Sequence, residues 1–253
     1  MNGARRGMVK ANSALAGIFA DRVKRRLPIV LAKAFAPRQT WNMGTDGITL
    51  GSDGRSRCAW AGSDELYQRY HDSEWGRPQG DGRALFEKLC LEGFQAGLSW
   101  ITILRKREAF RKHFEGFEID RVAEFGQPEI ERMLADPGII RHRGKIEAAI
   151  GNARAVRALE QREGRSFAAF LWSFEPPEEE RPERVTLDWV RANTVTPASS
   201  ALSKALRKAG FRFVGPTTCH AFMEAMGFVN DHMEGCACRA PCEAERKAFA
   251  RPR

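Results

Sequence analysis

The chain has 253 residues, of which 43% are hydrophobic and 29% are charged. This composition excludes wholesale disorder and fits one medium globular domain, or one domain with an appendage. The net charge of +9 suggests a polyanionic partner, but residues 1–57 hold 11 Lys/Arg against 3 Asp/Glu. Almost all of the excess charge therefore lies in an N-terminal arm, and the remaining body must bind any polyanion through local patches.

Residues 1–57 are expected to be a basic extension and linker with little order. The stretch RVKRRLPIVLAKAFA (22–36) has features of a targeting segment, but Asp21 and Lys33 favour an amphipathic basic helix or a disordered arm. Residues 38–57 are rich in Gly, Asp, Ser and Thr and are typical of a linker. No apolar run is long enough to span a membrane, so no membrane partner is expected. Six cysteines in a chain of this size indicate a reducing compartment, and we expect the cytoplasm.

Helical patterns dominate from Cys58 onward. Asp81 is suited to cap a helix that runs through Glu92 and beyond, and Ser200 is suited to cap the helix that Gly210 ends. The string FRFV (211–214) alternates like a strand, but a single strand cannot form a sheet. The body is therefore predicted to be all-α. The other expected helices cover about 102–114, 128–134 and 144–159, and a last one begins at Thr217 or Thr218 and ends at Gly227.

Two Cys and two His residues form a candidate metal site that would join the two ends of the body. Cys58 and His71 lie near its start, and His232 and Cys236 lie near its end. Two thiolates and two imidazoles complete a tetrahedral zinc shell with no open position, which is typical of a structural ion. The alternative is that buried cysteines and histidines coincide by chance. The two cysteines that follow Cys236 leave the identity of the second thiolate open.

The segment DPGIIRHRGKIEAAIGNARA (136–155) predicts a short turn between two helices. Gly138 and Gly144 allow the backbone to approach a ligand closely, and the amides that open the second helix can face an anion. These features describe a helix-hairpin-helix that binds the DNA backbone without reading sequence. An ordinary turn with solvated basic residues is the alternative. The positive charges around the turn are Arg141, Arg143 and Lys145.

Five aromatic residues gather within residues 60–100. Flat rings suit a flipped base, and a cationic base is further attracted to their faces, whereas burial in the core is the alternative. Glu92 falls at the margin of an apolar helix stripe, where a carboxylate is costly without a partner, so it is a site candidate unless it reaches solvent. Glu87 lies on the polar side of the same helix, where an ordinary surface charge is expected. The five aromatic residues are Trp60, Tyr67, Tyr70, Trp75 and Trp100.

Six strings of the body occur in this order along residues 58–232. They are CAW (58–60), YHDSEWG (70–76), LEGFQAGLSWITIL (91–104), GIIRHRGKI (138–146), LSKALRKAGFRFVGPTTC (202–219) and VNDH (229–232). Together they closely resemble 3-methyladenine DNA glycosylase I, a family of the helix-hairpin-helix DNA glycosylase superfamily. The resemblance covers residues 58–242. One departure is His220, at a position where the family usually has Tyr.

The resemblance implies a glycosylase domain over residues 58–242, followed by a basic tail at 243–253. It implies an all-α helix-hairpin-helix fold with one structural zinc ion tying its two ends together. The implied zinc ligands are Cys58, His71, His232 and Cys236. The residues implied to contact the extruded base are Glu92, Tyr70 and Trp100, with Trp60, Tyr67 and Trp75 helping to wall the pocket. The turn at Gly97 and Leu98 would probe the gap that the base leaves.

The implied reaction is the hydrolysis of the N-glycosidic bond of an N3-alkylated adenine flipped out of duplex DNA. Alkylation makes the base cationic and a good leaving group, so Glu92 would recognise it and stabilise the sugar cation while water attacks. Many related enzymes use an Asp, some with a Lys, beyond the hairpin. Neither type occurs between Lys145 and Asp188, so we predict a hydrolase without lyase activity. Damaged duplex DNA is the expected partner, bound by a monomer.

Two other functions remain open from the sequence. One is a zinc-stapled DNA-binding module without enzymatic activity, in which the aromatic residues form core and Glu92 is solvated. Release of a free base would separate the enzyme from this module. The other is a redox or zinc sensor built on the C-terminal cysteines, which reversible thiol oxidation would reveal. A sensor has no need of both the hairpin and the aromatic cluster, so we favour the enzyme.

Overall fold

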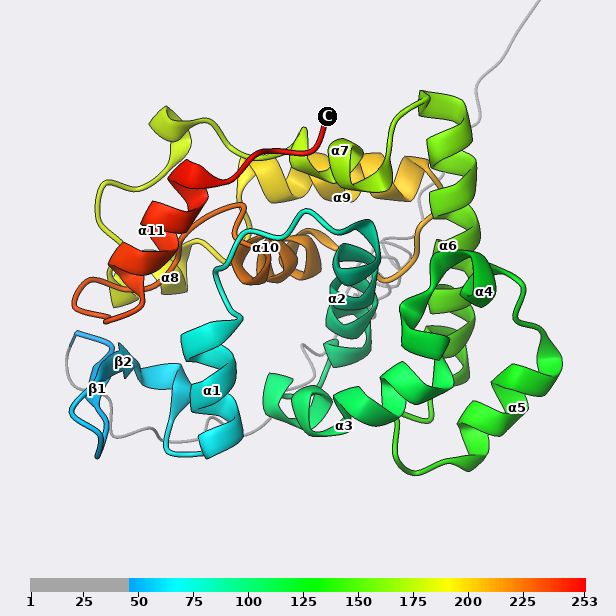
Figure 1. The fold of residues 1–253 in the computed structure, drawn as a ribbon, viewed down its shortest axis with the longest axis horizontal. Coiled ribbons are helices and arrows are strands. Elements are labelled where there is room, and N and C mark those ends of the chain that lie inside the picture. Colours follow the sequence, from blue (N-terminus) through cyan, green and yellow to red (C-terminus); the bar gives the residue numbers. More distant parts are fainter. Residues whose placement is uncertain (1–45) are drawn as a thin grey trace, which may run out of the picture. The chain divides into compact units, whose positions relative to one another are not determined.

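The computed structural model describes residues 46–253, and these fold into a mostly helical body (Figure 1). None of its helices is long and apolar enough to cross a membrane. Two short strands, β1 (Ile48–Leu50) and β2 (Ser56–Cys58), precede the helices. The α-helices are α1 (Glu65–Ser73), α2 (Gly82–Gln95), α3 (Trp100–His113), α4 (Ile119–Ala123), α5 (Gln127–Ala135), α6 (Arg143–Glu163), α7 (Phe167–Trp172), α8 (Leu187–Ala192), α9 (Pro197–Lys208), α10 (Pro216–Ala225) and α11 (Arg239–Ala248).

Helix α2 is the central element of the body (Figure 1). It contacts α3, α6, α7 and α10, and its residues 85, 86 and 88–94 are all buried. Asp81 accepts a hydrogen bond from the Ala84 amide at 2.7 Å and so caps the helix, as the sequence predicted. A helix enclosed on all sides is normally apolar all round. Charged side chains on α2 are therefore informative about function.

The expected helices are confirmed, with one different cap. Helices α3, α5, α6 and α10 cover the predicted segments within a few residues, and His142 caps α6. The cap of α9 is Thr196 and not Ser200, because Pro197 supplies a favourable first helical residue and Thr196 forms a capping box with Ser199. The FRFV string is an irregular connection between α9 and α10 and not a strand.

The all-α prediction missed a β-hairpin in the segment that was assigned to a linker. Strands β1 and β2 pair antiparallel, with Ile48 opposite Cys58. The turn between them is local: the Asp53 carboxylate accepts the Arg55 amide, and Gly54 has a φ of 76°. With only three residues a strand, the alternation was too short to detect.

Both ends of the described chain belong to the folded body. The Ala237 amide donates to the Ser56 carbonyl at 2.9 Å, which joins the hairpin to the C-terminal region. Residues 243–253, predicted to be a tail, include the end of α11 and pack on the body. Arg246 is 2% exposed and, like Arg251, pairs with Glu175. The predicted boundaries at residues 58 and 242 therefore both cut through this body.

Candidate active site

All five aromatic residues singled out in the sequence line one cavity together with Glu92. The cavity has a volume of about 200 Å³. Its aromatic wall is tightly connected: Trp60 lies 5.1 Å from Tyr67 and 5.0 Å from Trp75, measured between ring centroids. The indole Nε1 of Trp100 is buried and has no hydrogen-bond partner among the described residues. The remaining lining residues are Tyr70, Gln95, Val190, Ala221, Glu224, Asp231 and Met233.

Glu92 is buried and does not reach solvent as a surface residue would. It is 5% exposed, and its Oε1 lies 2.8 Å from the Nζ of Lys88, one turn earlier on α2. Two buried opposite charges hold each other in place, since either one alone would be costly to bury. The cavity therefore has a carboxylate in an aromatic surrounding, fixed by a specific partner.

Lys88 is a site residue that the sequence reasoning missed. Its Nζ donates to the Tyr70 hydroxyl at 2.7 Å and lies 3.3 Å from the centroid of the Trp100 ring. Burial lowers the pKa of Lys88, and the charge of Glu92 opposes this shift. The available signal was the spacing: a Lys and a Glu lie four residues apart on one helix, and the Glu borders its apolar stripe.

The two tyrosines of the cavity remain protonated. Burial, and then the charge of Glu92, raises the pKa of Tyr67 and of Tyr70 above the usual value. Each phenol therefore keeps its proton and offers a neutral ring face with a hydroxyl at its edge. Neutral rings suit a cationic ligand, because their negative faces attract it without a competing charge.

Glu224 and Asp231 form an acidic wall of the cavity that the sequence did not reveal. Burial, and then the charge of Asp231, raises the pKa of Glu224 well above its usual value, and burial raises the pKa of Asp231 to about 6. His220 lies behind them, with its Nε2 3.9 Å from Glu224 and 3.8 Å from Asp231. Burial lowers its pKa to about 4, so it is neutral at physiological pH. His220 thus packs against this wall and does not line the cavity.

The turn after α2 presents an exposed leucine beside the cavity. The Leu98 amide donates to the Gln95 carbonyl at 2.6 Å, and Gly97 has a φ of 83°, which a residue with a Cβ rarely adopts. Leu98 is 37% exposed. The turn is therefore fixed, while its apolar tip faces outward.

The predicted hairpin is a short turn between α5 and α6. The Gly138 amide donates to the Asp136 carboxylate at 2.6 Å, and a Cβ at Gly138 would lie only 3.2 Å from that of Ala109. A Cβ at Gly144 would lie 3.3 Å from Cε1 of the His142 ring. Both glycines thus serve close backbone contacts within the protein.

The three basic residues of the turn have different surroundings. Arg141 is exposed and has no ion-pair partner within residues 46–253, whereas Arg143 is exposed and pairs with Glu131 at 2.6 Å. Lys145 departs from its prediction as a phosphate contact. It is 8% exposed, and its Nζ donates to the carbonyls of Phe94 and Ala96 at 2.8 and 2.6 Å. Its charge therefore caps the C-terminal end of α2.

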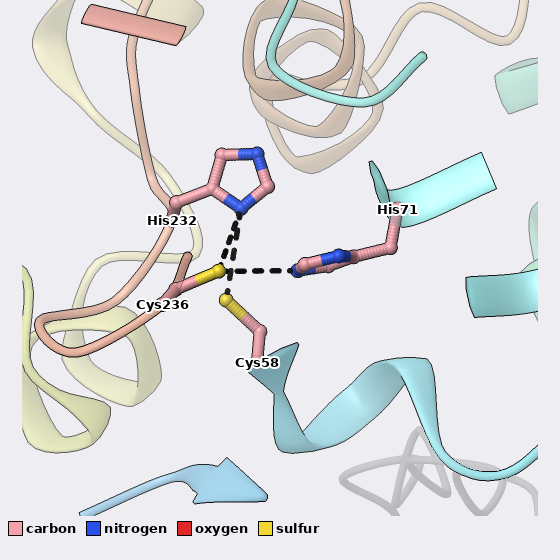
Figure 2. A group of neighbouring side chains, drawn as sticks. All are labelled: Cys58, His71, His232 and Cys236. Carbon is pink, nitrogen blue, oxygen red and sulfur yellow. Dashed lines mark hydrogen bonds between the residues drawn. The ribbon is translucent and has the colours of Figure 1, made fainter. Parts of the chain in front are cut away.

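The four predicted metal ligands form one buried cluster (Figure 2). Their ligand atoms all lie within 4.8 Å of one another. The Cys236 sulfur is 3.5 Å from His71 Nε2 and 3.4 Å from His232 Nδ1, and the Cys58 sulfur is 3.9 Å from His232 Nδ1. Strand β2 and helix α1 supply two of these residues, and the segment between α10 and α11 supplies the others.

Each member of this cluster also has an outer partner. His71 Nδ1 lies 2.8 Å from the Asp72 carboxylate, and His232 Nε2 lies 3.1 Å from the Trp75 carbonyl. The Cys58 sulfur accepts the Met233 amide, and the Cys236 sulfur accepts the Cys238 amide. Such partners orient metal ligands and fix the histidine tautomer. The Cys238 sulfur lies 3.9 Å from His71 Nδ1 and 3.7 Å from the Asp72 carboxylate, and with these two residues it forms a second, adjacent group of possible ligands.

Glu87 also differs from its prediction as a solvated charge. Its side chain is 15% exposed and pairs with Arg111 at 2.8 Å. It lines a separate cavity, which Tyr70 and Trp100 also border. Helix α2 therefore has two partly or fully buried ion pairs, and only the one with Glu92 borders the aromatic cavity.

Comparison with known proteins agrees with the six matching strings. Residues 60–240 match the family model for methyladenine glycosylase. DNA-3-methyladenine glycosylase 1 of Escherichia coli (strain K12) is 53% identical over 182 residues, which are 72% of this chain and 96% of the relative.

Solved structures match over the same share of the chain. A crystal structure of 3-methyladenine DNA glycosylase I matches with 54% identity and a TM-score of 0.68, covering 72% of this chain and 99% of its own. A tyrosine-to-phenylalanine variant of 3-methyladenine DNA glycosylase I, in complex with 3-methyladenine, matches with 38% identity and a TM-score of 0.67, covering 72% and 97%. The chain therefore belongs to the methyladenine glycosylase family.

Proposed function

We propose that this protein hydrolyses the N-glycosidic bond of N3-methylated adenine in duplex DNA and leaves an abasic site. The observation that carries the proposal is the Glu92 carboxylate, buried in a cavity walled by three tryptophans and two tyrosines. This combination suits a flat, cationic base. A related glycosylase of the same fold has been solved with 3-methyladenine bound, which supports this choice of base.

The chemistry needs little more than extrusion and electrostatic stabilisation, because a cationic adenine is already a good leaving group. Glu92 accepts a hydrogen bond from the base edge and stabilises the positive charge that develops on the sugar, while water is the nucleophile. Tyr70 and Trp100 contact the base, and Trp60, Tyr67 and Trp75 complete the pocket. The unpartnered Trp100 Nε1 is a free donor for the same ligand. Lys88 holds the Glu92 carboxylate in position through their ion pair.

We infer that the enzyme does not cleave the DNA strand. Lyase chemistry requires an amine that attacks the sugar as a nucleophile. Lys88 and Lys145 both have their amines engaged, one by Glu92 and Tyr70 and the other by two carbonyls of the α2 terminus. Strand nicks on damaged duplex, formed without heat or alkali, would contradict this inference.

Binding to the duplex is assigned to two exposed turns. Leu98, with Gly97 setting its turn, enters the gap that the flipped base leaves. The hairpin at Gly138–Gly144 lies along the backbone, where Arg141 and Arg143 meet phosphates. Lys145 is not assigned to a phosphate. Its amine bonds the carbonyls at the end of α2 and so holds the hairpin against the turn that carries Leu98.

We infer that the buried Cys/His cluster binds one zinc ion with a structural role. Two thiolates and two imidazoles are a complete tetrahedral zinc donor set, and each ligand already has an outer partner. The ligands Cys58 and His71 lie before α2, whereas His232 and Cys236 follow α10. The ion would therefore fix the two ends of the body against each other, and it takes no part in the reaction.

The test is a base-release assay on methylated duplex DNA, with zinc content measured on the same sample. Release of 3-methyladenine with intact phosphodiester bonds is the expected result. Binding of DNA without base release would instead identify a DNA-binding module that lacks enzymatic activity.

A further inference from the structure

Phe213 has an unusual combination of backbone conformation and exposure. Its φ is 57°, a left-handed value that only two other non-glycine residues share within residues 46–253. Its side chain is among the few large hydrophobic ones that are exposed there, with 36% of its surface accessible. A bulky residue in this conformation carries strain, and strained residues cluster at functional sites.

The surrounding structure enforces this conformation. Asn152, buried on α6, bonds the backbone of Arg212 twice: its Oδ1 accepts the Arg212 amide at 2.8 Å, and its Nδ2 donates to the Arg212 carbonyl at 3.1 Å. On the other side, the Ser203 hydroxyl donates to the Val214 carbonyl at 2.6 Å. Both peptide neighbours of Phe213 are therefore held by polar side chains.

Packing of the core does not require the Phe213 ring. Its neighbours Phe211 and Val214 are 4% and 1% exposed and supply the apolar contacts of this segment. Arg212 is exposed and has no ion-pair partner within the described part of the chain. The segment thus presents one aromatic and one guanidinium group to solvent, next to each other.

This segment lies between the two turns assigned to DNA binding. A Cβ at Gly93 would be 3.3 Å from the Cβ of Phe213, so the segment touches α2 one turn before Gly97. The Phe213 ring centroid lies 6.3 Å from that of His142, the capping residue of α6 at the end of the hairpin. The FRFV segment therefore bridges the leucine turn and the hairpin.

We propose that residues 212–213 form a third part of the DNA-binding surface. Phe213 presses its ring against the sugar and base edge beside the extruded nucleotide, and Arg212 meets a neighbouring phosphate. This inference rests on the proposed function, because it needs a duplex on this face. A rigid, preformed aromatic loses little freedom on binding, which explains why the strained conformation is maintained.

The test compares Phe213→Ala and Phe213→Tyr with Leu50→Ala. Leu50 is 73% exposed and lies on the β-hairpin, so it is a matched apolar surface control. Affinity is measured for a duplex with a stable abasic analogue, and free 3-methyladenine binding is followed by tryptophan fluorescence. We expect Phe213→Ala to weaken duplex binding about ten-fold or more, as expected for loss of one aromatic contact with a base. Phe213→Tyr and Leu50→Ala should bind the duplex as the wild type does.

Free-base binding separates this inference from the proposed function. It should be unchanged in all three variants, because Phe213 lies outside the aromatic cavity. Duplex affinity of Phe213→Ala within two-fold of wild type would overturn the role of Phe213 and leave the enzyme assignment intact. A wild-type protein that neither binds the abasic duplex nor releases base would overturn both.

Discussion

The Glu92 carboxylate and the Lys88 ammonium lie 2.8 Å apart on consecutive turns of the central helix, and both side chains are at most 6% exposed. Breaking a buried pair by removing one partner leaves a charge without compensation, which costs about 3–5 kcal/mol of unfolding free energy. The pair therefore links the stability of α2 to the geometry of the cavity.

A double-mutant cycle tests this coupling. We expect Lys88→Met to destabilise the protein strongly in urea unfolding, because Glu92 is then buried alone. Adding Glu92→Gln should recover part of the loss, since the unpaired charge is gone. Losses that simply add in the double variant would show that the two charges do not depend on each other.

The acidic wall makes stability depend on pH in a defined direction. Burial raises the folded-state pKa of Glu224 above its usual value of 4.5. The contribution of Glu224 to the free energy of unfolding is therefore fully present below pH 4.5. The contribution is lost as pH rises through the folded pKa. The Glu224→Gln variant does not undergo this loss. The melting temperature of the variant relative to that of the wild type should therefore increase as pH rises from 4.5 to 8.

Glu108→Gln is the control for this pH series, because Glu108 is 79% exposed on α3. Its melting curve should follow that of the wild type at every pH. A Glu224→Gln difference that is constant across the range would contradict the raised pKa.

The zinc proposed for the buried Cys/His cluster predicts a dependence on Asp72. Its carboxylate orients His71 at 2.8 Å and is itself held by Arg57, so Asp72→Asn should weaken zinc affinity about 10- to 100-fold. Zinc content and melting temperature should fall together on titration with a chelator. Cys90→Ser, a buried thiol outside the cluster, is the control and should retain full zinc. Full zinc retention by Cys58→Ser would contradict the assigned ligand set.

Salt dependence distinguishes Arg141 from Lys145, two of the three basic residues of the hairpin. Arg141 is exposed, so Arg141→Ala should reduce the slope of log affinity for duplex DNA against log salt by about one. Lys145→Met should leave that slope unchanged while lowering stability, because its amine serves the α2 terminus. A reduced slope for Lys145→Met would restore its original assignment as a phosphate contact.

Local patterns predicted most of the helices but not the partners of their buried charges. Asp81 capped α2 as expected, because capping depends on residues next to each other in the chain. The spacing of Lys88 and Glu92 is local, but the burial of the pair depends on the other helices that enclose α2, which the periodicity of one segment does not reveal. The burial of Lys145 depends on a contact with carbonyls about fifty residues away.

The cavity was predicted in part for the same reason. Its aromatic residues fall within one stretch of sequence and were recognisable, whereas Glu224 and Asp231 come from the C-terminal third of the chain. Nothing local marks these two as neighbours of Glu92. The left-handed conformation of Phe213 was not predictable either, because its alternating string resembles a strand. The conformation depends on Asn152, a residue far away in the sequence that holds the backbone of Arg212.

The most direct test of the central claim is single-turnover release of bases from methylated duplex DNA by the wild type, Glu92→Gln and Glu108→Gln. The account predicts that the wild type and Glu108→Gln release 3-methyladenine at the same rate, and that Glu92→Gln is slower by about 100-fold, as for loss of one preorganised electrostatic group. Equal release by Glu92→Gln, or no release of 3-methyladenine by the wild type, would contradict it.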